Sequence, residues 1–148
     1  MAEIQHFDFV VIGTGPGGEG AAMRAAKGGK RVAAVERFSQ VGGGCTHWAT
    51  IPSKALRQAI YHMSLCNQSP IYKRIDVQAK FSFPELLATA NSVIDKQVQL
   101  RESFYDRNEV ILVMPIDEKT ANRLSRLAIG DPVTCTGIGS VKTKGRSR

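Results

Sequence analysis

The feature that most constrains this chain is a glycine-rich turn directly after a short apolar run. FDFVVIG, residues 7–13, has the composition of a strand buried on both faces of a parallel sheet. The turn GTGPGG follows, and EGAAMRAAKGGK then has the small side chains of a helix that ends near Gly28. RVAAVE, residues 31–36, is predicted as a second strand. This order predicts a strand-helix-strand unit of about 30 residues with a right-handed crossover.

The turn matches the pattern GxGxxG and predicts a site for a dinucleotide pyrophosphate. Gly13 would make the tight turn, Gly15 would let the backbone approach the anion, and Gly18 would let helix and strand pack closely. Amides at the start of the helix would hold the negative charge. Glu36 ends the second strand, where a carboxylate can accept both hydroxyls of an adenosine ribose. The alternative is a structural turn followed by a solvated glutamate. Arg37 would flank the adenine or only balance the charge of Glu36.

Two helices and a third strand are predicted beyond this unit. Residues 38–50 are glycine-rich and predicted as a loop, after which Pro52 would start a helix with an apolar stripe. A polar, turn-prone link covers residues 67–80. The second helix would open at Pro84 and end near Asn108.

The last third of the chain has little of the apolar periodicity that predicts helices and strands. EVILVM, residues 109–114, is predicted as a strand. Beyond it, only DEKTANRLSRLAIG could form a short helix. We therefore predict a partial nucleotide-binding domain over residues 1–114 and a divergent, poorly ordered basic tail over residues 115–148.

One stretch carries a resemblance to a known family. VGGGCTHWATIPSKAL, residues 41–56, aligns without gaps to the redox motif of the flavoprotein disulfide reductases, GGTCxxxGCIPSK. With VVIGTGPGGEGAA and VERF upstream, it resembles the soluble pyridine nucleotide transhydrogenase branch of the class I pyridine nucleotide-disulfide oxidoreductases. That branch has the motif GGGCTHWGTIPSKAL, from which this sequence departs at Ala49. The resemblance covers about residues 7–108 and implies an α/β fold, an incomplete Rossmann-like FAD-binding domain with a parallel sheet.

The resemblance also implies a reaction. The disulfide reductases use two cysteines five positions apart, but here Cys45 is followed by Thr50, which can form neither a disulfide nor a thiolate. Hydride exchange between nicotinamide and flavin needs no sulfur. The implied activity is hydride transfer from NADPH to NAD+ through FAD. A lipoamide-dehydrogenase-like disulfide reductase and a non-catalytic FAD-binding remnant are the alternatives.

The resemblance further implies a role for each matching residue. Gly13, Gly15 and Gly18 would hold the FAD pyrophosphate and Glu36 its ribose. Lys54 would lie near the flavin N5, where a cation stabilises negative charge on the reduced ring. Thr50 would face the isoalloxazine, and no residue is assigned a certain catalytic role. The remaining cofactor-binding residues implied between ribose and flavin are Arg37, Phe38, Ser39, Gln40, Val41, Gly42, Gly43, Gly44 and Cys45.

Composition narrows the possible partners. The net charge of +7 is spread along the chain, and its densest part, VKTKGRSR at 141–148, lacks the aromatic residues of a nucleic-acid surface. No apolar run approaches the roughly 20 residues of a membrane span, and the N-terminus does not have the pattern of a secretory signal. Three cysteines without a CxxC argue against a disulfide framework or a zinc site. We therefore expect a cytoplasmic protein without nucleic-acid, membrane or metal partners.

Length sets the last expectation. The family needs an FAD domain, a nicotinamide domain and an interface domain, about 450 residues at ~150 per domain, and its members are homo-oligomers. Every match to GxGxxG in the 148 residues lies within residues 13–20, and there is no separate one for NADPH or NAD+. We therefore expect an N-terminal fragment that is inactive as a transhydrogenase by itself.

Overall fold

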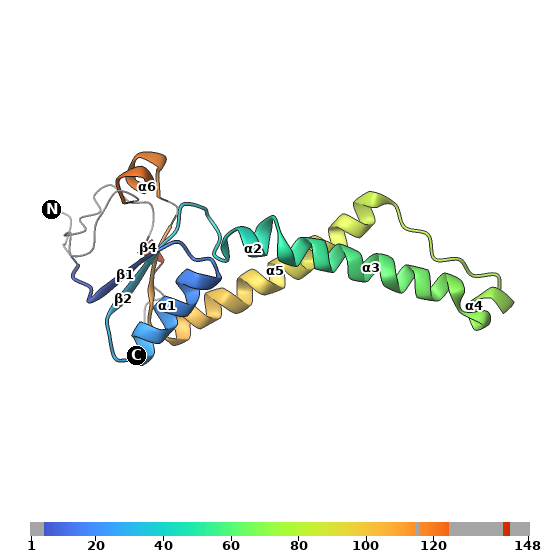
Figure 1. Cartoon of the computed structure of the whole chain (residues 1–148), viewed down its shortest axis with the longest axis horizontal. Coiled ribbons are helices and arrows are strands. Elements are labelled where there is room, and N and C mark those ends of the chain that lie inside the picture. The colour runs from blue at the N-terminus through green and yellow to red at the C-terminus, as the bar shows by residue number, and fades with distance from the viewer. Residues whose placement is uncertain (1–4, 115, 125–140, 143–148) are drawn as a thin grey trace. The chain divides into compact units, whose positions relative to one another are not determined.

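The computed structural model describes residues 5–114, 116–124 and 141–142 (Figure 1). The chain divides into two compact units, Met1–Gly43 with Val98–Arg148, and Gly44–Gln97. Each unit is described by itself below. None of the helices in the described ranges is both long and apolar enough to cross a membrane.

The first unit is built on a small parallel sheet. The strands β1 (Phe9–Ile12), β2 (Val32–Val35) and β3 (Ile111–Val113) run parallel in the order β1-β2-β3. A two-residue strand, β4 (Val141–Lys142), pairs antiparallel with β3. The predicted α/β fold with a parallel sheet is therefore confirmed, and the three predicted strands form one sheet.

Helix α1 (Pro16–Lys27) makes the crossover between β1 and β2. Pro16 lies in its first turn, where a missing N–H is tolerated, and Ala22 is fully buried. Gly28 caps its C-terminus and Gly29 adopts a φ of 76°. The predicted strand-helix-strand unit is thus present with its predicted helix stop.

The last turns of helix α5 (Phe83–Arg107) also belong to the first unit. Val98 and Tyr105 are buried there. Arg101 forms an ion pair with Glu19 of α1, with 2.8 Å between Nη1 and Oε2. This pair fixes the end of α5 against the crossover helix.

The core of the first unit lies on the sheet. Val35, Val113 and Ile116 form a buried cluster against which Val10 and Ile111 pack. All four residues of β2 are buried. Burial on both faces was predicted for residues 7–13, and it is wrong for β1, because Phe9 is 44% exposed and Ile12 is 52% exposed. The physical reason is position: within the described residues, β1 pairs with β2 alone and forms an edge of the sheet.

The second unit is helical. It contains α3 (Thr50–Gln68), α4 (Pro70–Arg74), the first part of α5, and most of α2 (Gly43–His47). Two of these helices were not predicted: α2 lies in the segment predicted as a loop, and α4 lies in the predicted polar link. Helix α3 begins at Thr50, two residues before the predicted Pro52, and the bounds of α5 lie within one residue of those predicted.

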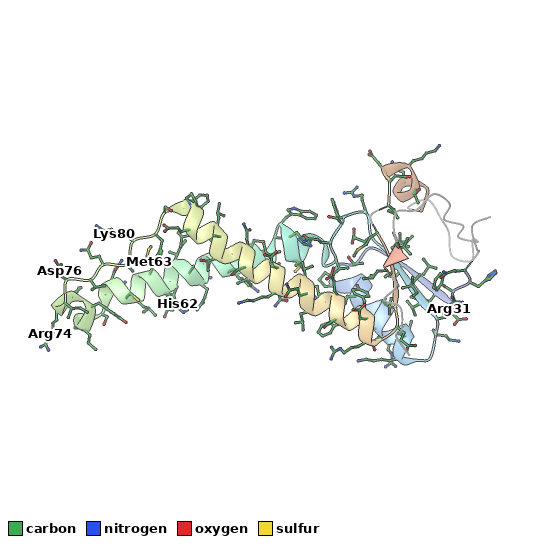
Figure 2. The ribbon with its side chains drawn as sticks, turned by 180° about the vertical axis from the view of Figure 1, so that it is seen from behind. Arg31, His62, Met63, Arg74, Asp76 and Lys80 are labelled. Carbon is green, nitrogen blue, oxygen red and sulfur yellow. The ribbon has the colours of Figure 1, made fainter. Side chains whose placement is uncertain are left out.

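Local side-chain bonds order the second unit. Asn67 bonds both the N–H and the carbonyl of Ala79, at 2.8 and 3.0 Å. The N–H and hydroxyl of Ser82 donate to Glu85, which lowers the pKa of that carboxyl and caps α5. None of the residues of α3 is buried. Figure 2 shows Arg74 and Asp76 at the α4 end of this unit, with their side chains directed away from the ribbon.

Part of the predicted tail is described. Helix α6 (Glu118–Leu124) lies in DEKTANRLSRLAIG, the stretch that could form a short helix, and β4 was not predicted. Residues 125–140 and 143–148 lie outside the described part of the chain. The division at residue 114 and the poorly ordered tail therefore stay predictions.

Candidate dinucleotide-binding site

The glycine-rich turn brings the start of α1 against the end of β1. The Gly13 N–H donates to the Val35 carbonyl at 2.7 Å, so the turn begins where β1 is still paired with β2. A Cβ placed at Gly18 would overlap the Gly13 carbonyl oxygen and lie 3.2 Å from Val11 Cγ1. Only glycine allows this approach of helix and strand, as the pattern predicted for the third glycine.

No side chain caps the N–H groups in the first turn of α1, so they can donate to a bound acceptor. Gly15 is its N-cap in an extended conformation, with φ −66° and ψ 176°, and no side chain caps the helix there. The early N–H groups of a helix lack partners within the helix, and they attract anions. With three glycines and no capping side chain, this turn has the donors and the open backbone that a pyrophosphate requires.

Glu36 is held at the end of β2 by donors from its own chain. Its Oε2 accepts from the N–H and the hydroxyl of Thr14, at 2.9 and 2.6 Å. Its Oε1 accepts from the N–H groups of Arg37 and Phe38, at 2.7 and 3.2 Å. Glu36 is only 5% exposed, and a buried carboxylate needs such donors because it has lost its hydration.

Glu36 connects the phosphate turn to the end of β2, a structural role that the sequence did not predict. A carboxylate has about four acceptor positions, and four donors of this chain already use them. A ribose hydroxyl would therefore take the place of one of these donors, and the ribose role of Glu36 stays a prediction. The contacts themselves tie the phosphate turn to the end of β2.

Thr14 extends the connection to a third segment. Its hydroxyl oxygen accepts from the Gly42 N–H at 3.2 Å, and both Thr14 and Val41 are fully buried. A Cβ at Gly43, where φ is 60°, would lie 2.8 Å from Gly15 Cα. The glycine run after β2 therefore packs directly on the phosphate turn.

Sequence reasoning did not identify Thr14. The pattern GxGxxG treats its second position as any residue, so the pattern itself gave no signal. The signal that was available is a hydroxyl side chain between two glycines of a turn, with a glutamate predicted to end the neighbouring strand.

Arg37 and Phe38 take part in this network through their backbone N–H groups. The Arg37 guanidinium lies over the Phe38 ring, 4.8 Å from its centroid. Ser39 and Gln40 are exposed. Arg37 therefore stacks on an aromatic neighbour and does not pair with the carboxylate of Glu36 through its side chain; its predicted contact with adenine stays a prediction.

Four predicted site residues belong to the second unit. Gly44 and the half-buried Cys45 lie in α2, and Cys45 is a free thiol. Thr50 is the first residue of α3, and Lys54 follows one turn later with its side chain exposed. At a spacing of four, Thr50 and Lys54 share one face of the helix. Their roles toward a flavin stay predictions.

Comparisons with known proteins show which family the chain belongs to. Residues 7–125 match the family model described as pyridine nucleotide-disulphide oxidoreductase. The chain is 53% identical over 113 residues to a soluble pyridine nucleotide transhydrogenase of Vibrio cholerae serotype O1, covering 76% of this chain and 24% of the relative. A protein with the same name from Colwellia psychrerythraea is 53% identical over 104 residues, covering 70% of this chain and 22% of the relative. The chain therefore spans about a quarter of the length of these relatives.

A solved structure shows the same fold. The HOCl-induced flavoprotein disulfide reductase RclA from Escherichia coli aligns with a TM-score of 0.54 and 21% identity, over 71% of this chain and 21% of that protein. The glycine turn, the parallel sheet and the family match over most of the chain agree. This chain belongs to the pyridine nucleotide-disulphide oxidoreductase family.

Proposed function

We propose that this chain is the FAD-binding part of a soluble pyridine nucleotide transhydrogenase. The observation that supports FAD as the cofactor is the geometry of the phosphate turn. Gly18 packs against Gly13 in this turn, and the Thr14 hydroxyl connects the turn to the end of β2 by its hydrogen bond to Glu36. The names of the relatives support the reaction, which moves hydride from NADPH to NAD+ to give NADP+ and NADH. Bound FAD would accept and return the hydride.

The chain's own residues would bind and orient the cofactor. The uncapped first turn of α1 would donate to the pyrophosphate, and the backbone at Gly42 and Gly43 would follow the cofactor away from the adenosine. Glu36 would accept from the ribose after giving up one of its present donors. Lys54, exposed on α3, would offer a cation to the flavin ring.

Thr50 favours this reaction over disulfide reduction. It occupies the position five residues after Cys45, and its hydroxyl cannot take part in thiol-disulfide exchange. RclA, which is named a disulfide reductase, shares the fold with this chain, and its likeness supports the fold alone. The missing second sulfur is therefore the observation that separates the two activities.

A chimera tests the reaction. The 113 matched residues of this chain would replace the corresponding quarter of the Vibrio cholerae relative. We expect the chimera to bind FAD and to move hydride from NADPH to thio-NAD+, without reducing lipoamide or glutathione disulfide. A Thr50→Cys chimera serves as the matched control, because it restores the second sulfur. Disulfide reduction by the Thr50 form would favour the reductase alternative, and failure to bind FAD would favour the non-catalytic remnant.

We also propose a cytoplasmic location and a homo-oligomeric whole protein. The location is supported by the odd cysteine count without CxxC and by the word soluble in the names of the relatives. Fractionation with the chain tagged, and sedimentation of the purified chimera, would test the two statements separately.

A further inference from the structure

The two oxygens of the Glu36 carboxylate have different surroundings. Oε2 accepts from the N–H and the hydroxyl of Thr14, and both of these bonds are buried. Oε1 accepts from the N–H groups of Arg37 and Phe38, and these bonds are only partly buried. Arg37 and Phe38 are exposed residues, whereas Thr14 is fully buried. A ligand that arrives from solvent therefore meets Oε1, while Oε2 stays enclosed by the phosphate turn.

One of the two donors to Oε1 is easier to displace than the other. The Arg37 N–H lies 2.7 Å from Oε1, and the Phe38 N–H lies 3.2 Å from it. The second bond is the longest of the four at Glu36 and lies at the long end of the range for N–H donors. Phe38 is exposed, so water can replace the lost partner of its N–H. A ribose hydroxyl can thus take this position without disturbing the contact of Glu36 with Thr14.

The Thr14 hydroxyl holds the other oxygen in a fixed direction. It has one hydrogen, which it donates to Oε2 at 2.6 Å, because a carboxylate offers only acceptors. The same hydroxyl oxygen accepts from the Gly42 N–H at 3.2 Å. A hydrogen bond to a charged group at this short distance is among the stronger ones in proteins. The Glu36 side chain is therefore held in one orientation from the side that solvent does not reach.

We propose that Thr14 is a positioning residue for adenosine recognition. Its hydroxyl holds Oε2 of Glu36 so that Oε1 faces the ribose hydroxyls of a bound dinucleotide. Through its second hydrogen bond, the same hydroxyl connects this ribose contact to the Gly42 N–H. The ribose contact rests on the proposed function, whereas the network of Thr14, Glu36 and Gly42 does not.

The hydroxyl of Thr14 and its shape can be separated by substitution. Valine has the same shape but no donor, so Glu36 would lose its shortest hydrogen bond and gain access to other rotamers. Fewer molecules would then present Oε1 to a ligand, and ordering the side chain would oppose binding. Serine keeps the donor. Only ligands that carry ribose hydroxyls should respond to the loss of this orientation.

The test is calorimetric titration of the full chain with ADP and with 2′,3′-dideoxy-ADP, which keeps the adenine and the pyrophosphate but has no ribose hydroxyls. We expect the wild type to bind ADP about tenfold or more tightly than the dideoxy analogue, because a hydrogen bond to a charged group is lost. Thr14→Val should weaken ADP binding by about tenfold and binding of the analogue by less than about twofold. Thr14→Ser should keep the wild-type affinities. Thr89→Val, at an exposed threonine of α5, is the matched control and should leave both affinities unchanged.

Two results would overturn the role of Thr14. Equal weakening of both ligands by Thr14→Val would show that Thr14 acts on the phosphate turn alone. Equal binding of both ligands by the wild type would show that Glu36 does not accept from the ribose, and the dinucleotide site itself would stand. A wild-type chain that binds neither ligand would contradict the proposed function together with this role.

Should Thr14→Val fail to fold, nuclear magnetic resonance of the wild type decides. ADP should shift the Gly42 amide, because the ribose contact reaches it through Glu36 and Thr14. The dideoxy analogue should leave that amide in place while it shifts the amides of the glycine turn. Equal shifts of the Gly42 amide with the two ligands would overturn the proposal.

Discussion

The Thr14 hydroxyl donates to Glu36 Oε2 at 2.6 Å and accepts from the Gly42 N–H, so one side chain joins the phosphate turn to two later segments. Thr14 is fully buried and Glu36 nearly so, which removes water as a substitute partner. The turn is therefore positioned by a buried polar network as well as by its glycines.

Thr14→Val keeps the shape of the side chain and removes the hydroxyl. It would leave a buried carboxylate oxygen and the Gly42 N–H each short of one partner, so we expect the free energy of unfolding to fall by about 1–3 kcal/mol. Urea unfolding followed by circular dichroism measures this change. Thr14→Ser keeps the hydroxyl and is the matched control; a loss in Thr14→Ser with none in Thr14→Val would show that the methyl group, and not the hydroxyl, matters.

Gly18→Ala and Gly20→Ala compare two glycines of α1. A Cβ at Gly18 overlaps the Gly13 carbonyl, whereas a Cβ at Gly20 meets nothing within 4 Å. We expect Gly18→Ala to destabilise the first unit by about 2 kcal/mol or more, because the strand end must move. Gly20→Ala should stabilise the chain by about 0.5–1 kcal/mol, since alanine favours a helix interior. Thermal unfolding of the two variants in parallel checks the prediction, and a tolerated Gly18→Ala would contradict the close approach.

Tyr105 is fully buried, and its hydroxyl has no hydrogen-bond partner among the described residues. Burial, and next the nearby Glu19 carboxylate, raises the pKa of this phenol above its ordinary value of 10.0. Because ionisation is easier in the unfolded chain, the stability linked to Tyr105 is complete below pH 10 and declines as the pH rises above it.

We expect Tyr105→Phe to equal or exceed the wild type in stability at neutral pH, by up to about 1 kcal/mol, since it removes an unpaired buried hydroxyl. The variant should also lose less stability between pH 9 and 11 than the wild type does. Unfolding curves across that range test both points. A destabilised Tyr105→Phe would mean that the hydroxyl has a partner that stabilises the fold.

The ion pair between Arg101 and Glu19 is mostly shielded, with side chains 15% and 16% exposed. Arg101→Met and Glu19→Gln, alone and together, form a double-mutant cycle. We expect a coupling of about 1 kcal/mol, larger than for an exposed pair, because less water screens the charges. Purely additive losses in urea unfolding would show that the pair contributes packing only.

The strand-helix-strand unit could be predicted because its strands, glycine turn and helix stop each leave a local signal. The helices α2 and α4 could not, since five residues contain too few turns for an apolar period to show. The exposure of Phe9 and Ile12 was missed for another reason: an apolar run shows that a strand suits a sheet interior, but not whether a neighbour is present.

The contacts of the candidate site also divide into those that the sequence could predict and those that it could not. Gly18 acts locally, so the pattern predicted its close approach to the strand, whereas the contact of Gly43 with Gly15 was not predicted. The Thr14–Glu36 bond joins residues 22 positions apart, and it depends on the register of β1 and β2. No spacing rule contains that register, which is why Thr14 was overlooked.

The most direct test of the account is an amide-resolved titration of the purified chain with FAD, followed by nuclear magnetic resonance. We expect the largest shifts at the Gly15, Gly17 and Gly18 amides, smaller ones at Gly42 and Gly43, and competition by ADP, which carries the same pyrophosphate and adenosine. Gly18→Ala should abolish these shifts, and Gly20→Ala should keep them. Binding of FAD with no change at the glycine turn, or no binding at any accessible FAD concentration, would contradict the central claim that this turn holds the dinucleotide.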